Sequence, residues 1–395
     1  MSIAGWHNFA KKFGKRWLLR RCGATFRYEE PVTPQIKPPF FLVANHTTVY
    51  DPFLISCGLD APIRYVTSDL YFRRPILRFL AQRAGCIPKA KSFSDLSAVR
   101  ELLRAKDEGY AVGVFPEGYR NWDGVTDKLI YSTAKLVRLL KIPVIAAVSA
   151  GGYLSMPRWA DHDRRGVREI SYRLLITGDE VKSLSVEEIY QKLTDGLTHN
   201  DYLWQRRHMR PYPARTPAQS LELMLYACPH CRSLESMVSW EDRFTCKSCG
   251  YQTRINEFGF FQEEPPYPLY FDNARDWRVF CDGLLRDMLE KRYAGDEVVF
   301  TRQAELLREK EKGGRFRRWR EGECRLYPGR FLFKDRQGEL EMPFCEIRGL
   351  NVTKKNCLDF YFEGTKYRLR PMDSCVSALP WELAFHFYTD AAKLE

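Results

Sequence analysis

His46 and Asp51 stand five residues apart in the string NHTTVYDP, residues 45–52. An imidazole can remove a proton from a hydroxyl group, and a carboxylate beside it fixes its tautomer and stabilises the imidazolium that forms. On a regular helix this offset turns the two side chains about 140° apart. We therefore expect them to meet across a loop or the first turn of a helix, which Pro52 favours. From this string alone, a structural polar pair remains the alternative.

A second string, FPEGYR at residues 115–120, follows an apolar run at the position where α/β proteins bind ligands. Gly118 permits a tight turn, and Arg120 offers a fork of donors that suits a phosphate group. Because Glu117 is an anion, we interpret it as holding Arg120 or nearby backbone amides in place. Two further strings are GCIPK, which ends in the cation Lys89, and the apolar IPVI at residues 142–145.

In their order and spacing the four strings resemble the glycerolipid acyltransferase family, the family of the 1-acylglycerol-3-phosphate acyltransferases. The resemblance implies that His46 is the general base and that Asp51 orients it. It implies that acyl-CoA or acyl carrier protein donates a fatty acyl group to the free hydroxyl of 1-acylglycerol-3-phosphate, giving phosphatidic acid. It also implies that the acceptor phosphate is bound by Glu117, Gly118, Arg120 and Lys89.

Two positions depart from the pattern of that family. Tyr119 stands where a threonine is usual, and Lys89 stands where an arginine is usual. Tyrosine is much larger than threonine, and lysine replaces a bidentate fork with a point charge. A different lysophospholipid or a lipid alcohol is therefore the alternative acceptor. We interpret the hydroxyls of Thr47 and Thr48 as hydrogen-bonding groups at the start of a helix rather than as substrate ligands.

Four of the twelve cysteines form two CxxC pairs, Cys228 with Cys231 and Cys246 with Cys249, at the spacing of a zinc ribbon. Four thiolates complete a tetrahedral shell with no open position for water, so we predict a structural zinc without a catalytic role. Redox chemistry of the CxxC pairs is the alternative. We interpret His230, inside the first pair, as a bystander.

The net charge of +12 indicates a polyanionic partner, either nucleic acid or an anionic membrane. Seven lysines and arginines precede the first acidic residue, Glu29, and residues 1–28 predict a basic helix with an aromatic stripe. Such a helix is typical of a membrane-surface anchor, and ordinary packing on the next domain is the alternative. Basic and acidic residues balance within the ribbon, which disfavours nucleic acid.

No apolar run reaches 18 residues and no signal peptide is recognisable, so we expect a cytoplasmic protein bound peripherally to the inner face of a membrane. Alternatives of another class are a zinc-ribbon nucleic-acid-binding protein and a lipid-binding scaffold without catalysis. A cluster of four arginines in residues 315–320, interleaved with Phe316 and Trp319, predicts a surface for headgroups or for a protein. The alternative there is a solvated basic face over packed aromatics.

The 395-residue length predicts two or three domains. Short apolar runs alternate with helical segments in the first half, which predicts an α/β sandwich on a mostly parallel sheet. Near the end, short strands followed by one helix resemble a pleckstrin-homology-like or GRAM-like barrel. In chain order we predict a basic amphipathic helix (1–28), an acyltransferase domain (29–203), a linker (204–220), a zinc ribbon (221–262), a helical connector (263–312) and a β-rich, pleckstrin-homology-like domain (313–395).

Overall fold

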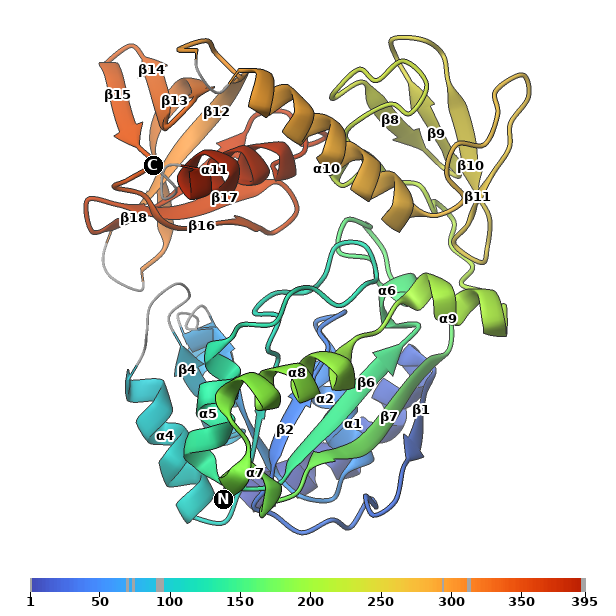
Figure 1. Ribbon diagram of the computed structural model, residues 1–395, viewed down its shortest axis with the longest axis vertical. Coiled ribbons are helices and arrows are strands. Elements are labelled where there is room, and N and C mark those ends of the chain that lie inside the picture. Colours follow the sequence, from blue (N-terminus) through green and yellow to red (C-terminus); the bar gives the residue numbers. More distant parts are fainter. Residues whose placement is uncertain are drawn as a thin grey trace. The chain divides into compact units, whose positions relative to one another are not determined.

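The computed structural model describes residues 2–68, 71–72, 75–89, 96–292, 295–310 and 314–391 (Figure 1). The chain divides into two compact units. The N-terminal unit comprises Met1–Arg158, His162–Ala214 and Glu257–Gly259. The C-terminal unit comprises Trp159–Asp161, Arg215–Asn256 and Phe260–Glu395.

A seven-stranded sheet forms the centre of the N-terminal unit, in the order β1-β7-β6-β2-β5-β3-β4. Neighbouring strands are parallel except β6 and β7. The predicted sandwich on a mostly parallel sheet is confirmed. The strands are β1 (Ala24–Tyr28), β2 (Phe41–Ala44), β3 (Ile63–Ser68), β4 (Ile87–Lys89), β5 (Ala111–Val114), β6 (Val144–Ala150) and β7 (Arg168–Ile176).

Helices cover both faces of this sheet, because the side chains of the central strand alternate between two cores. On β2, Phe41 and Val43 pack with α4, α5 and α8, whereas Leu42 and Ala44 pack with α2. The helices are α1 (Ile3–Cys22), α2 (Asp51–Gly58), α3 (Pro75–Arg83), α4 (Leu96–Asp107), α5 (Ser132–Leu140), α6 (Gly152–Ser155), α7 (Glu180–Ser183), α8 (Val186–Leu197) and α9 (Asp201–His208).

The helix predicted over residues 1–28 is wrong beyond Cys22. Gly23 ends it with a positive φ of 59°, and a Cβ at this glycine would lie 2.1 Å from the backbone oxygen of Gly166. The chain then forms β1 at the edge of the sheet. The linker predicted from residue 204 is also wrong at its start, because residues 204–208 belong to α9, which the Asn200 side chain caps.

The C-terminal unit contains a four-stranded antiparallel sheet and a seven-stranded antiparallel half-barrel. The first sheet carries the cysteine pairs and is followed by α10 (Ala274–Lys291). Its elements are the 3₁₀-helix η2 (Leu221–Leu223), β8 (Met237–Trp240), β9 (Arg243–Cys246), β10 (Gln252–Ile255) and β11 (Phe261–Gln262).

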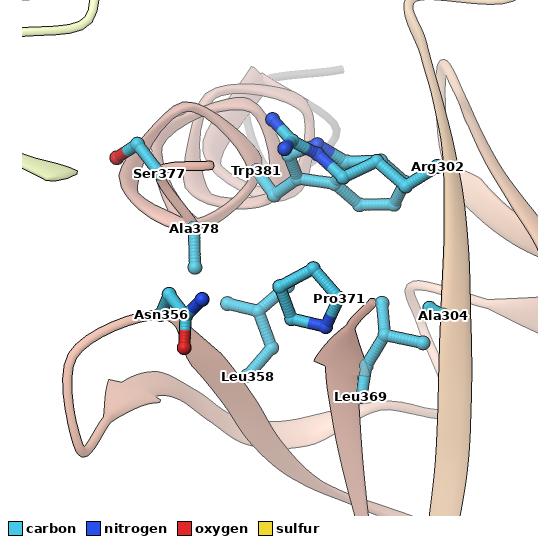
Figure 2. Close-up of a pocket in the computed structure, with 9 residues that line it drawn as sticks. All are labelled: Arg302, Ala304, Asn356, Leu358, Leu369, Pro371, Ser377, Ala378 and Trp381. Atoms are coloured by element: carbon cyan, nitrogen blue, oxygen red, sulfur yellow. The ribbon is translucent and has the colours of Figure 1, made fainter. Parts of the chain in front are cut away.

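The half-barrel has the strand order β15-β14-β13-β12-β18-β17-β16 and ends in α11 (Leu379–Ala391). The predicted β-rich character of the C-terminal region is confirmed, but its strands begin with β12, before the predicted start at residue 313. A pocket beside α11 has Trp381 and Arg302 on one side and Leu358 and Pro371 on the other (Figure 2). The strands are β12 (Phe300–Glu309), β13 (Phe316–Tyr327), β14 (Arg330–Asp335), β15 (Gly338–Pro343), β16 (Arg348–Thr353), β17 (Cys357–Phe362) and β18 (Thr365–Pro371).

Strand β12 contradicts the helical connector predicted over residues 263–312, of which 311–313 lie outside the described residues. The charged, leucine-containing stretch is typical of a helix, but β12 pairs with β13 and β18 in the middle of the sheet. Ala304 and Leu306 are buried there and Glu305 between them is not, which is the two-residue period of a strand. Pairing on both sides overrides local propensity.

Candidate active site

His46 and Asp51 meet where β2 ends and α2 begins. The Nδ1 atom of His46 donates to Asp51 Oδ2 at 2.9 Å. The histidine side chain is 21% exposed and the aspartate side chain is 1% exposed. The pair therefore meets in the first turn of a helix, as the spacing predicts. With Nδ1 bound to the carboxylate, Nε2 is the nitrogen left to take a proton.

Asp51 is held by the loop that precedes it. Oδ2 accepts from the backbone nitrogens of Thr47 and Thr48 at 2.7 and 2.8 Å, and Oδ1 accepts from Thr48 Oγ1 at 2.7 Å. Burial by itself raises the pKa of Asp51, but the hydrogen bond and charge of His46 and the bonds from Thr48 outweigh it and lower the pKa. Asp51 is thus an anion. The hydroxyls of both threonines bond its carboxylate at the start of α2, with Thr47 Oγ1 at 3.3 Å from Oδ1.

Two neighbours that the sequence analysis did not single out position the histidine. The ring of Phe115 stacks on the His46 ring with 4.3 Å between centroids. The side-chain amide of Asn45 exchanges two hydrogen bonds with the backbone of Ser149 on β6, at 3.0 and 2.8 Å. Both residues belong to the strings that drew attention to the site, but only the strand order shows what they contact.

Glu117 joins the two loops of the site. The residue is 3% exposed, and its carboxyl oxygens accept from the backbone nitrogens of His46 at 2.5 Å and Asp127 at 2.8 Å. Burial raises the pKa of Glu117 to about 8, against the opposing effect of these two bonds. Glu117 therefore holds backbone amides, one of the two roles that its sequence context indicates, and no hydrogen bond or ion pair joins it to Arg120 within the described ranges.

We expect the Glu117→Gln substitution to lower stability by about 1–3 kcal/mol, because an amide can accept at only one of the two positions. The loss should also depend on pH. Above its ordinary pKa of 4.5 the unfolded carboxyl releases its proton while the folded one keeps it up to about 8. The free energy of unfolding of the wild type therefore falls as pH rises through this window, and the variant lacks that slope.

Thermal unfolding of both proteins at about pH 5 and about pH 9 measures the effect. The difference in stability between wild type and Glu117→Gln should shrink at the higher pH. A difference that is the same at both pH values would contradict the assignment.

Arg120 contributes a positive charge that interacts with Asp51. No hydrogen bond or ion pair of the described ranges involves its guanidinium, and burial lowers its pKa against the attraction of Asp51. Gly118 has a positive φ of 78°, so the turn before it requires glycine. Lys89 ends β4, at the same sheet edge as His46, because β2, β5, β3 and β4 are parallel neighbours. No described hydrogen bond or ion pair connects Lys89 to the other site residues.

A second histidine–aspartate pair lies elsewhere in the same unit. His199 Nε2 and Asp201 Oδ1 are 2.7 Å apart, and Asp201 also accepts from the backbone nitrogens of Gly151 and Tyr153. Asp201 therefore ties the start of α9 to the residues after β6. This pair was not predicted from the sequence. We assign it a structural role, because its carboxylate joins two backbone segments.

The four cysteines of the CxxC pairs come together in the C-terminal unit, with their sulfurs within 4.8 Å of one another. Cys228 and Cys249 are 3.7 Å apart between sulfurs, as are Cys231 and Cys246. Thiolates at 2.3 Å from one tetrahedral ion are about 3.8 Å apart, so the donor set fits a metal ion. His230 bonds Tyr270 through Nδ1 at 2.8 Å, which is consistent with a bystander.

Two of the four arginines in the cluster of residues 315–320 form ion pairs. Arg318 pairs with Glu321 at 2.7 Å and the buried Arg320 pairs with Asp335. Trp319 packs against Tyr367, with 5.6 Å between ring centroids. This arrangement favours the alternative interpretation, a charged face over packed aromatics.

Comparison with known proteins addresses the N-terminal unit. Residues 23–150 match the family model described as Acyltransferase. Among solved structures, the chain is similar to the 1-acyl-sn-glycerophosphate (LPA) acyltransferase PlsC from Thermotoga maritima, with a TM-score of 0.42 and 19% identity over 51% of this chain and 79% of that chain. The sequence matches no curated protein. The segment that matches the family model holds every residue predicted for the active site.

Proposed function

We propose that this chain transfers a fatty acyl group from acyl-CoA or acyl carrier protein to the free hydroxyl of 1-acylglycerol-3-phosphate, giving phosphatidic acid. The observation that carries the proposal is the contact between His46 and Asp51 at 2.9 Å, near Arg120, whose guanidinium has no hydrogen-bond or ion-pair partner among the described residues. The family match supports acyl transfer as the reaction class. The acceptor is inferred from the cation.

In the proposed mechanism His46 acts on the acceptor hydroxyl. Its Nε2 takes the hydroxyl proton while the oxygen attacks the thioester carbonyl, and Asp51 stabilises the imidazolium. The new carbon–oxygen bond replaces the carbon–sulfur bond, and the imidazolium returns its proton to the leaving thiolate. No covalent acyl-enzyme is required, because the base and the acceptor act in one step.

Arg120 suits the acceptor phosphate because a desolvated guanidinium without an anion is unfavourable until one binds. Lys89 offers a second positive charge at the same sheet edge. Tyr119, 41% exposed in the turn between Gly118 and Arg120, occupies more volume than the threonine usual in the family. Because of this difference in size, a different lysophospholipid or a lipid alcohol is the alternative acceptor.

We expect Arg120→Met to raise KM for a phosphate-bearing acceptor about 10-fold to 100-fold, since a charge-assisted bond contributes about 1.5–3 kcal/mol. Transfer to a monoacylglycerol, which has no phosphate, should stay unchanged. Purified full-length chain, acyl-CoA and acyl carrier protein donors, and mass spectrometry of the lipid products provide the measurement. Arg104→Met, on the exposed side of α4, is the matched control. Equal losses on both acceptors would count against phosphate binding by Arg120.

We further propose that α1 and α3 bind the surface of an anionic membrane. Their exposed apolar side chains form what we call the aromatic face, which comprises Phe9, Phe13 and Trp17 on α1 and Ile76, Phe79 and Leu80 on α3. Trp6 packs against Phe79 and links the two helices. Leu18 and Leu19 pack on the core, so ordinary packing accounts for only part of α1. No helix among the described residues is long and apolar enough to cross a membrane.

The double substitution Phe13→Ser and Trp17→Ser should weaken binding to vesicles of phosphatidylcholine and phosphatidylserine by about 10-fold or more, because each buried aromatic contributes about 1.5–3 kcal/mol. Co-sedimentation measures the affinity. Trp240→Ser provides the control, because Trp240 is 71% exposed in the C-terminal unit. Undiminished binding by the double variant would exclude the aromatic face as the anchor.

A further inference from the structure

A buried arginine on β7, Arg168, contacts the loop that holds the catalytic pair. The Arg168 side chain is 2% exposed, and no carboxylate of the described ranges lies within ion-pair distance of it. Its Nη1 atom donates to Thr48 Oγ1 at 3.2 Å, and its Nε atom has no hydrogen-bond partner. A buried charge without an anion is unfavourable. A negative charge close to Arg168 would therefore stabilise it.

The hydroxyl of Thr48 connects Arg168 to Asp51. Its oxygen accepts from Arg168 Nη1 and from the backbone nitrogen of Tyr50, both at 3.2 Å. A hydroxyl oxygen has two acceptor positions and one proton. The two donors occupy the acceptor positions, so the proton points to Asp51 Oδ1 at 2.7 Å. Arg168 thus faces the Asp51 carboxylate through a single hydroxyl group.

We propose that Arg168 is a positioning residue that acts through the Thr48 hydroxyl to keep Asp51 ionised and oriented toward His46. This inference rests on the proposed function, in which His46 is the base. The hydrogen bond from Thr48 and the positive charge of Arg168 offset part of the negative charge of Asp51. The carboxylate therefore stabilises the imidazolium less than it would without them. Loss of either contact would leave the full carboxylate charge facing His46.

Other titratable or charged groups face the same cluster. They are Cys22 at the end of α1, Tyr50 before α2, Tyr65 on β3, Glu117 and Arg120 after β5, and Tyr212. The substitutions at Thr48 and Arg168 leave all of these in place. A change in pH dependence shared by the two substitutions therefore reports on the connection between Arg168 and Asp51.

The test is the pH profile of kcat/KM for acyl transfer by the full chain carrying Arg168→Met or Thr48→Val. Methionine removes the charge and keeps much of the buried volume, and valine removes the hydroxyl and keeps the shape. Either substitution removes a group that offsets the charge of Asp51, so this charge acts more strongly on His46. The acid limb of the kcat/KM profile should therefore move to higher pH by about 0.5–1 unit. Below the limb, kcat/KM then falls about three- to ten-fold.

Three further variants separate positioning from stability. The double variant should shift the acid limb no further than the larger single shift, because both residues act in one chain of contacts. Thr48→Ser should restore the wild-type limb. Arg173→Met, also on β7, removes an arginine that donates to Gly196 O at 2.5 Å and likewise has an unpartnered Nε. It should leave the limb in place even where it lowers stability.

Wild-type acid limbs in both Arg168→Met and Thr48→Val would overturn the inference, as would an equal shift in Arg173→Met. If Arg168→Met does not fold, the acid limb of Thr48→Val tests the inference. Failure of the proposed function gives a different result, because then His46→Ala retains acyl transfer. Loss of transfer in His46→Ala together with unmoved limbs would refute only the role of Arg168.

Discussion

We expect the rate of acyl transfer to fall by about 10²-fold to 10⁴-fold when His46 is replaced by alanine. The proton of the acceptor hydroxyl then has no base to receive it. The substitution removes a side chain that is 21% exposed and lies on the surface of the Phe115 ring. The fold should therefore persist, with a thermal unfolding midpoint near that of the wild type. Labelled acyl groups followed into the lipid product measure the rate.

His199→Ala is a matched control for His46→Ala. Both histidines contact a buried aspartate in the same unit, at 2.9 Å for His46 and 2.7 Å for His199. Loss of His199 should lower stability without lowering the turnover of the folded protein. Undiminished turnover in His46→Ala, or an equal loss of turnover in His199→Ala, would refute the role of His46 as the base.

Removal of the metal is expected to unfold the ribbon of the C-terminal unit. We propose that the ion is zinc, for which binding to such sites contributes about 10–16 kcal/mol in isolated zinc-finger peptides. Four side chains of the ribbon region, Phe244, Tyr251, Phe261 and Phe271, contact the ring of Trp277 on α10. Its Nε1 donates to Ala227 O at 2.9 Å, next to Cys228. Loss of the ion should therefore expose Trp277.

Elemental analysis of the purified protein should find one zinc ion per chain, and Cys228→Ser should lose it. Near-ultraviolet circular dichroism and tryptophan fluorescence report on the nine tryptophans, Trp277 among them, in this variant and in chelator-treated wild type. Cys345→Ser, which changes an exposed cysteine outside the cluster, should keep both the ion and the spectra. A metal-free wild type with the same spectra would exclude a structural ion.

The local parts of the candidate active site could be predicted because short strings contain them. His46 and Asp51 lie within one loop and the helix turn that follows, so their contact depends on few backbone angles. The parallel sheet follows from the alternation of apolar runs and helical segments. The paired cysteines likewise predict a metal site, because each CxxC pair can supply two ligands from one turn.

Elements whose environment is distant in sequence could not be predicted in the same way. Strand β12 has the composition of a helix and becomes a strand because β13 and β18 pair with it on both sides. Strand β1 exists because the edge of β7 is open to it. The chain after Cys22 follows that edge rather than continuing α1.

Residue types and their short spacings are properties of the chain, and they suffice to indicate acyl transfer and a metal site. The tertiary structure decides what supports those groups. Glu117 reaches the backbone of His46 across 71 residues, and Arg168 reaches Thr48 across 120. Both contacts depend on β2 lying between β5 and β6, with β7 next to β6. Strand order is set by the burial of the whole sheet, so no short string contains it.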